Sequence, residues 1–268
     1  MTVLWGLSFV VVKWALADAG FLGLTALRMS LGFVVLVLVG RAHLRQATAL
    51  EWKAGLLCGA VLTGGYLLQT AGLRTCSAAA AGFLTAFYVA LTPVLEGLVF
   101  RRMPSSRNVV VLVVAAIGIV VMVADQELRI AGGEVLVALS AVLWSAQIVI
   151  VGRVAKRVSA RRLAAIQVGA VALASSVAFG VSAEPMPEFT PRLLACVAYL
   201  GIGTCALCFL IQAWGQRSVS PTRAATLYAG EPVFAAIFGV TLLSERFDMT
   251  DWLGSALVML AIALTLRR

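Results

Sequence analysis

The segment YAGEPVFAAIFGVTLLSER, from Tyr228 to Arg246, is long and apolar enough to cross a lipid bilayer as a helix. Near its middle an acid and a proline stand side by side, Glu231 and Pro232. An ionisable group at that depth is energetically costly, which makes Glu231 a candidate for a functional site. Proline removes a backbone hydrogen bond and bends a helix, so we predict hinges at Pro232 and, in the segment 77–100, at Pro93.

The composition of the whole chain is that of a membrane protein. Hydrophobic residues make up 62% of the sequence and charged residues only 12%, whereas soluble proteins carry about 25% charged residues. Apolar runs recur from end to end, which predicts an all-α membrane protein without a soluble domain. The first run, from Val3 to Ala17, is short for a span, and we expect its first turns to precede residue 1. The ten transmembrane helices are predicted at about 2–17, 21–40, 52–72, 77–100, 107–124, 132–152, 160–182, 190–214, 220–242 and 249–266.

Lysine and arginine residues are concentrated in alternate loops of this ten-helix arrangement. The even-numbered loops and the C-terminus hold fifteen, namely Arg41, Arg45, Lys53, Arg101, Arg102, Arg107, Arg153, Lys156, Arg157, Arg161, Arg162, Arg217, Arg223, Arg267 and Arg268. The odd-numbered loops hold four, namely Arg74, Arg129, Arg192 and Arg246. Because basic loops stay in the cytoplasm, this bias predicts that both termini are cytoplasmic. The net charge of +9 therefore reflects topology, and we expect no nucleic-acid partner.

The cysteine and histidine content gives no sign of metal or redox chemistry. The five cysteines lie mostly within apolar runs and are expected to be small buried side chains rather than disulfides. Cys205 and Cys208 form a CxxC pair, but neither a second pair nor a neighbouring histidine accompanies it. The single histidine, His43, lies among basic loop residues. We therefore expect no catalytic residue, no metal, no cofactor and no enzyme activity.

The sequence also repeats itself at a long interval. QTAGLRTCS at 69–77 matches QAWGQRSVS at 212–220, an offset of 143, and LWGLSFVVV at Leu4 is echoed by LWSAQIVIV at Leu143. Each half of the chain holds five predicted helices, so the second copy enters the membrane upside down. We predict two inverted five-helix repeats, residues 1–126 and 127–268, with a substrate site near the midplane between them.

Polar and aromatic side chains deep within the spans form a candidate substrate site, lined chiefly by predicted helices 1, 3, 4, 6, 8 and 9. Aromatic rings suit partly apolar or cationic solutes. Arg28 either reaches the outer headgroups or captures a substrate carboxylate. Glu231 is a counter-charge for an amine, a proton site, or a structural carboxylate that accepts hydrogen bonds. The candidate residues are Trp5, Ser8, Phe9, Arg28, Tyr66, Gln69, Tyr88, Trp144, Gln147, Tyr228 and Glu231.

Several of these motifs together resemble the EamA-type drug/metabolite transporters. The resemblance covers the whole chain and rests on Trp5-Gly6 with Ser8-Phe9, on LTPVLEGLVFRR at 91–102 and on EPVFAAIFGVTLLSER at 231–246. It implies a small-solute carrier of the bacterial inner membrane, often an exporter of amino acids or related metabolites. One departure is that Arg101-Arg102 stand near the position that Glu245-Arg246 occupy in the second half.

These observations favour a secondary carrier, either gradient-driven or facilitative, that works by alternating access in the export direction. Its small substrate is either an amino acid or another amine-bearing compound. A proton-coupled exporter of cationic drugs or other metabolites is the alternative within the same class. A channel is the next alternative, and a membrane-embedded enzyme would need clustered His, Asp or Arg at one interface. Stripes of small residues permit either a monomer or a homodimer in the bilayer.

Overall fold

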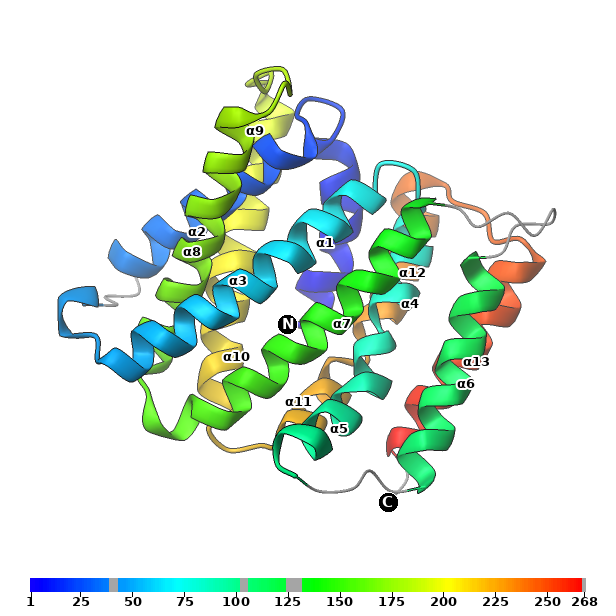
Figure 1. Ribbon diagram of the computed structural model, residues 1–268. Coiled ribbons are helices and arrows are strands. Elements are labelled where there is room, and N and C mark those ends of the chain that lie inside the picture. The colour runs from blue at the N-terminus through cyan, green and yellow to red at the C-terminus, as the bar shows by residue number, and fades with distance from the viewer. Residues whose placement is uncertain (39–42, 102–105, 124–131, 267–268) are drawn as a thin grey trace.

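The computed structural model describes residues 1–38, 43–101, 106–123 and 132–266, and this part of the chain is helical, without a β-strand (Figure 1). The predicted boundary between residues 126 and 127 and the side chain of Arg102 lie outside the described residues. The helices are α1 (Thr2–Ala15), α2 (Phe21–Leu38), α3 (Ala49–Gly72), α4 (Ala78–Thr85), α5 (Phe87–Val99), α6 (Ser106–Val123), α7 (Gly132–Val154), α8 (Ala160–Val181), α9 (Pro191–Ala198), α10 (Phe209–Gly215), α11 (Pro221–Tyr228), α12 (Glu231–Leu243) and α13 (Met249–Leu266).

Seven helical segments of the described chain are long and apolar enough to cross a membrane. They are Phe21–Leu38, Ala49–Gly72, Ala78–Val99, Gly132–Arg157, Ala160–Val181, Pro191–Gly215 and Pro221–Leu243. Three shorter apolar helices, Thr2–Ala15, Val109–Val121 and Met249–Leu264, lie at the positions of the other predicted spans. Large apolar side chains such as Leu38, Leu173 and Val181 are exposed on the outside of the bundle, where lipid rather than water suits them.

Two segments that were each predicted as one continuous helix are interrupted in the structure. The segment Ala78–Val99 breaks at Ala86, between α4 and α5, and Pro93 lies inside α5. The segment Pro221–Leu243 breaks between α11 and α12, and Pro232 lies in the first turn of α12. Ser77 and Ser220 cap α4 and α11 by accepting hydrogen bonds from backbone N–H groups three residues later.

The segment Pro191–Gly215 contains a wide helical stretch that the sequence pattern did not predict. Between α9 and α10 the chain forms a π-helix, η3, over Tyr199–Cys208. In a π-helix the backbone hydrogen bonds span five residues, and such turns occur often at functional sites. The stretch is rich in small residues, and a Cβ on Gly201 would lie 2.9 Å from the Cβ of Leu31 and 3.0 Å from the carbonyl oxygen of Arg28, both on α2.

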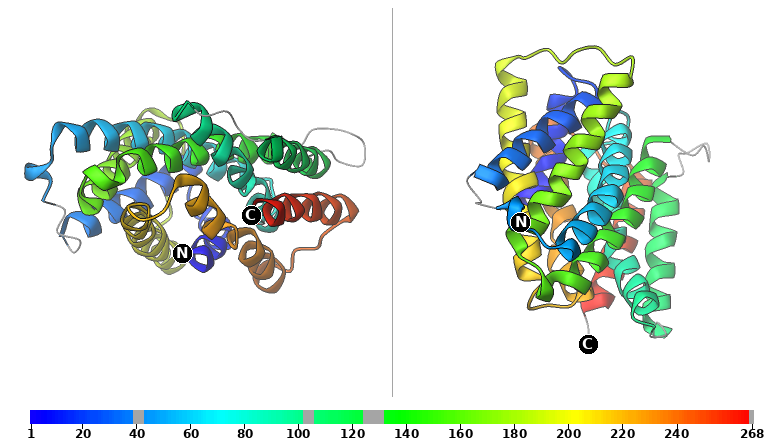
Figure 2. Two further views of the ribbon diagram at one scale, coloured as in Figure 1. Left: turned by 90° about the horizontal axis from the view of Figure 1, so that it is seen from below. Right: turned by 60° about the vertical axis from the view of Figure 1, so that its left-hand side comes forward.

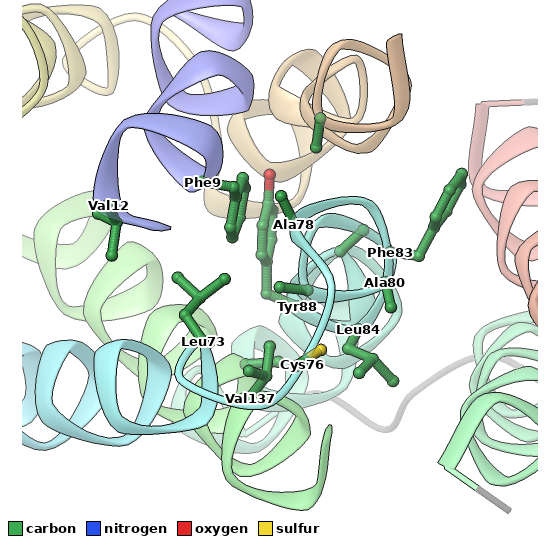
Figure 3. Packing of buried hydrophobic residues seen from close by; sticks show 14 of the residues in the cluster. Phe9, Val12, Leu73, Cys76, Ala78, Ala80, Phe83, Leu84, Tyr88 and Val137 are labelled. Atoms are coloured by element: carbon green, nitrogen blue, oxygen red, sulfur yellow. The ribbon is translucent and has the colours of Figure 1, made fainter. Parts of the chain in front are cut away.

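Helices that are distant in sequence lie side by side throughout the bundle. The pairs α2–α8, α3–α7, α6–α13 and α1–α12 are extensively packed, and Figure 2 shows α6 and α13 together at one edge. Glycines let these helices approach closely, because a Cβ on Gly118 of α6 would lie 2.9 Å from the carbonyl oxygen of Gly254 on α13. Elsewhere buried apolar side chains fill the interior, and Figure 3 shows Phe9, Tyr88 and Val137 converging from α1, α5 and α7.

Candidate functional site

A narrow cavity of about 40 Å³ lies in the middle of the bundle between the interrupted helices and their neighbours. All eleven candidate side chains predicted from the sequence line it, although their role in substrate binding stays a prediction. Because the space runs between closely packed side chains, a bound solute requires the rings around it to move apart. Five further residues, which were not among the predicted candidates, also line the cavity: Thr85, Ile148, Thr204, Phe209 and Gln212.

Five aromatic rings form a continuous chain along the cavity. The Tyr66 ring lies edge-on to Trp144, with centroids 4.8 Å apart, and 6.2 Å from the ring of Phe209. Trp5 lies 6.3 Å from Phe209 and 5.3 Å from Tyr228, again edge-on. Edge-to-face packing of this kind is the preferred arrangement of aromatic pairs. The rings give the site a mostly apolar wall that can also attract a cation through ring faces.

Arg28, on α2, brings a positive charge to this apolar site. Its side chain is only 3% exposed, so it does not reach the outer surface of the protein. One terminal nitrogen, Nη2, donates a hydrogen bond to Oγ1 of Thr70 at 2.6 Å, and the guanidinium carbon lies 4.6 Å from the centroid of the Tyr66 ring. Nε is buried and has no hydrogen-bond partner. A buried donor without a partner is costly, and Nε of Arg28 therefore retains the capacity to donate to a further acceptor.

Glu231 brings a carboxyl group to the same cavity. It is the first residue of α12, directly after the interruption, and its side chain is buried. Tyr88 donates a hydrogen bond from its hydroxyl to Oε2 of Glu231 at 3.1 Å. Among the described residues, no basic side chain forms an ion pair with this carboxyl.

Buried amide side chains add hydrogen-bonding capacity to the site. Nε2 of Gln147 donates to Oε1 of Gln167 at 3.1 Å and to Oε1 of Gln212 at 3.2 Å. Gln69 donates to Oγ1 of Thr85 at 3.0 Å. Nε2 of Gln167 is buried without a partner. Gln167 does not line the cavity itself, and it contacts the site through its hydrogen bond with Gln147.

Outside the cavity, acidic side chains cap the first turns of helices that are distant from them in sequence. Glu245, after α12, accepts hydrogen bonds from the backbone N–H of Ala78 at 2.7 Å and of Ala79 at 3.0 Å, at the start of α4. Glu96, on α5, accepts from the backbone N–H of Thr222 at 2.9 Å and also from its hydroxyl, at the start of α11. Negatively charged groups at a helix N-terminus accept hydrogen bonds from the backbone N–H groups that have no partner within the helix.

Two more carboxyl groups make the same kind of contact at the helix pair α2–α8. Glu184, between α8 and α9, accepts hydrogen bonds from the backbone N–H groups of Leu22 and Gly23 at 3.1 Å. Glu51, on α3, accepts from the backbone N–H of Ser159 at 2.7 Å and pairs with Arg162 at 2.8 Å. The first half of the chain has Arg101-Arg102 near the position that Glu245-Arg246 occupy in the second half. It nevertheless supplies a carboxyl cap, because Glu96, a little over one turn before Arg101, caps α11.

Comparisons with known proteins agree with this architecture. An uncharacterized transporter of Archaeoglobus fulgidus is 26% identical over 262 residues, which are 98% of this chain and 82% of the relative. The uncharacterized transporter YwfM of Bacillus subtilis is 42% identical over 74 residues, 27% of this chain and 25% of the relative. A crystal structure with 21% sequence identity shares the fold, with a TM-score of 0.74 over 99% of this chain and 93% of the other. The sequence matches the EamA-like transporter family over residues 1–124 and 131–267, and the chain is therefore a member of this family of multi-pass membrane transporters.

Proposed function

We propose that this transporter is a secondary carrier for a small amphipathic metabolite that bears an amine and a carboxylate, with an amino acid as the best candidate. The observation that carries the proposal is the pair of opposite charges in one aromatic cavity, Arg28 and Glu231. Arg28 has a buried donor without a partner, and Glu231 has a single hydroxyl neighbour. A substrate carboxylate would satisfy the first group, and a substrate ammonium would neutralise the second.

The charges of the cavity also limit the choice of substrate. Arg28 is the one basic side chain among the residues that line the described cavity. A phosphorylated sugar or a nucleotide sugar carries two or more negative charges and would require paired basic groups near the midplane. The sequence contains no phosphate-binding loop of the Walker type, so an ion or substrate gradient must supply the driving force.

For the mechanism we propose alternating access between two inverted five-helix repeats, residues 1–126 and 127–268, with ten transmembrane helices, both termini in the cytoplasm of a bacterial inner membrane and net export. The offset of 143 residues supports this arrangement. Tyr88 and Glu231 are separated by that offset and contact each other, and so do Tyr66 and Phe209. The helix interruptions at Ala86 and at Ala229 are separated by the same offset, and the predicted hinges Pro93 and Pro232 lie seven and three residues after them. These breaks are the places where we expect the helices to bend.

A second function within the same class is proton-coupled export of cationic drugs or related compounds. Two features favour it: Glu231 has no basic partner among the described residues, and the rings of the cavity suit organic cations. In that case Glu231 exchanges a proton for the cationic substrate, and Arg28 has a structural role on Thr70 and Tyr66. The two functions differ in the substrate they require, because the second function needs no carboxylate on the substrate.

Uptake of a panel of labelled solutes into proteoliposomes, with and without a pH gradient, tests the proposal. The panel holds several amino acids, a polyamine, an aromatic cation and a phosphosugar. Saturable transport of an amino acid and none of the phosphosugar is the expected result. Transport of the organic cation alone would replace the first function by the second, and flux that rises linearly with concentration would indicate a channel.

A further inference from the structure

A second hollow, separate from the central cavity, lies at the end of the bundle where α7 joins α8 and where α10 ends. It has a volume of about 790 Å³, opens to the surface, and shares no lining residue with the central cavity. Figure 1 shows the α7–α8 connection and the α10–α11 connection at the same end of the molecule. This end is the cytoplasmic one in the proposed topology, and the hollow lies where the chain leaves the apolar part of the bundle.

Four basic side chains surround the hollow without acidic partners: Lys156, Arg157, Arg161 and Arg217. All four are exposed, and none of them forms an ion pair within the part of the chain that the structure describes. Arg162, the fifth basic residue there, is held by Glu51 and is therefore already neutralised. Unpaired charges of one sign around a concave surface attract a ligand of the opposite sign more strongly than scattered charges do.

The other wall of the hollow is apolar and faces outward. It is formed by Leu210, Ile211 and Trp214 of α10, and the indole of Trp214 is 67% exposed. Tryptophan is enriched at the membrane–water interface, where its ring sits at the level of the lipid headgroups. The hollow therefore places a cationic rim directly beside a surface that suits an acyl chain.

We propose that this hollow binds an anionic glycerophospholipid, with its phosphate among Arg157, Arg161 and Arg217 and its acyl chain along Trp214. Basic pockets between helices on the cytoplasmic side of membrane proteins bind such headgroups. The N-terminus of α8 is already capped by Glu51, so the attraction comes from the three arginine side chains. The ligand contacts α10 on the face opposite Gln212, which lines the central cavity.

A general preference for basic loops on the cytoplasmic side explains the charges without any binding site, so the test compares two charge-matched variants. The first is Arg157→Gln/Arg161→Gln/Arg217→Gln, and the second is Arg45→Gln/Arg101→Gln/Arg223→Gln. The second set is exposed on the same predicted side and lies outside the hollow. Each protein is purified in detergent and titrated with phosphatidylglycerol or with phosphatidylcholine, and bound lipid is counted by native mass spectrometry.

We expect the wild type and the second variant to bind phosphatidylglycerol in preference to phosphatidylcholine. The first variant should bind phosphatidylglycerol about 100-fold more weakly, because each of its three removed basic groups contributes about fivefold near an anionic headgroup. Thermal unfolding in detergent without added lipid checks that both variants are folded. If the first variant does not fold, the single substitutions Arg161→Gln and Arg217→Gln are measured instead, each with an expected loss of about fivefold.

Two results would contradict the proposal that the hollow binds an anionic phospholipid. Equal weakening in both triple variants would mean that net charge alone attracts the lipid. Full displacement of phosphatidylglycerol by inorganic phosphate at an equal concentration would mean that the hollow is a phosphate site and that the acyl chain contributes nothing. Failure of the solute-uptake test leaves this measurement unaffected, so the two proposals are decided independently.

Discussion

The hydroxyl of Tyr88 donates a hydrogen bond to the carboxyl of Glu231 across 3.1 Å, although 143 residues separate them in the chain. Each stands directly after an interruption of a long helical segment, at Ala86 and at Ala229. The sequence match between 69–77 and 212–220 has the same offset. Two residues that are separated by the offset of the sequence repeat thus meet at the central cavity. A substitution of either one changes the hydrogen bonding of the other.

Glu231→Gln removes the negative charge while it preserves the shape of the side chain and an oxygen that accepts from Tyr88. If Glu231 carries the coupling proton, the variant loses accumulation driven by a pH gradient while it still exchanges substrate at equal pH. Tyr88→Phe keeps the charge and removes only the hydroxyl donor, so we expect a smaller loss. Both are measured as uptake in proteoliposomes, and accumulation by Glu231→Gln at the wild-type level would exclude Glu231 as the proton site.

Gly6→Ala tests the contact between α1 and α12 that positions Glu231. A Cβ on Gly6 would lie 2.5 Å from the Cβ of Phe234 and 2.9 Å from the carbonyl oxygen of Glu231, so the helices must separate. Overpacking of this kind costs about 1–3 kcal/mol, and we expect a lower melting temperature together with slower transport. Gly180→Ala on α8 is the control, because nothing lies within 4 Å of a Cβ there. Equal melting temperatures for the two variants would contradict this packing.

Glu245→Gln tests the cap on the first turn of α4. The carboxylate accepts two backbone hydrogen bonds there, and the neutral amide loses the charge interaction with the helix N-terminus. We expect a destabilisation of about 1–2 kcal/mol, measured by thermal unfolding in detergent. Glu188→Gln changes an exposed carboxyl and should leave the melting temperature unchanged. A loss of the same size in both variants would show that charge alone, rather than the cap, is responsible.

Much of the cavity was predictable because polar and aromatic residues deep in an apolar span have few alternatives to an internal site. Arg28 and Glu231 are examples, and both line the cavity. Phe209 escaped notice because phenylalanine is ordinary in a span, although its offset of 143 from Tyr66 could have revealed it. The π-helix at Tyr199–Cys208 packs against α2 and was not predicted from the sequence pattern. The break at Ala86 was not predicted either, because alanine favours an uninterrupted helix.

The loop between α1 and α2 carries an acid whose ionisation links stability to pH. Arg192 donates from Nε to Asp18 at 2.8 Å and Thr190 donates from its hydroxyl at 2.8 Å, and these hydrogen bonds hold the pKa of Asp18 below its ordinary value. A lowered folded-state pKa stabilises the protein above the ordinary value of about 3.9. That contribution is lost as the pH falls through the lowered pKa.

We therefore expect the melting temperature of the wild type to fall between about pH 5 and pH 3 more steeply than that of Asp18→Asn. The variant cannot ionise at this position, so its remaining slope comes from other carboxyl groups. The two proteins are compared by thermal unfolding in detergent at each pH. Parallel curves would show that the Arg192 contact contributes no pH-dependent stability.

The most direct test of the account is a cross between single-charge variants and single-charge substrates. Arg28→Gln, Glu231→Gln and the wild type are each reconstituted and challenged with an amino acid, with the corresponding amine that lacks the carboxylate, and with the corresponding acid that lacks the amine. Competition against the labelled amino acid gives the apparent affinity of each. We predict that Arg28→Gln loses the advantage of the amino acid over the amine, and that Glu231→Gln loses its advantage over the acid. Wild-type preferences in both variants would contradict the assignment of the two charges to the substrate.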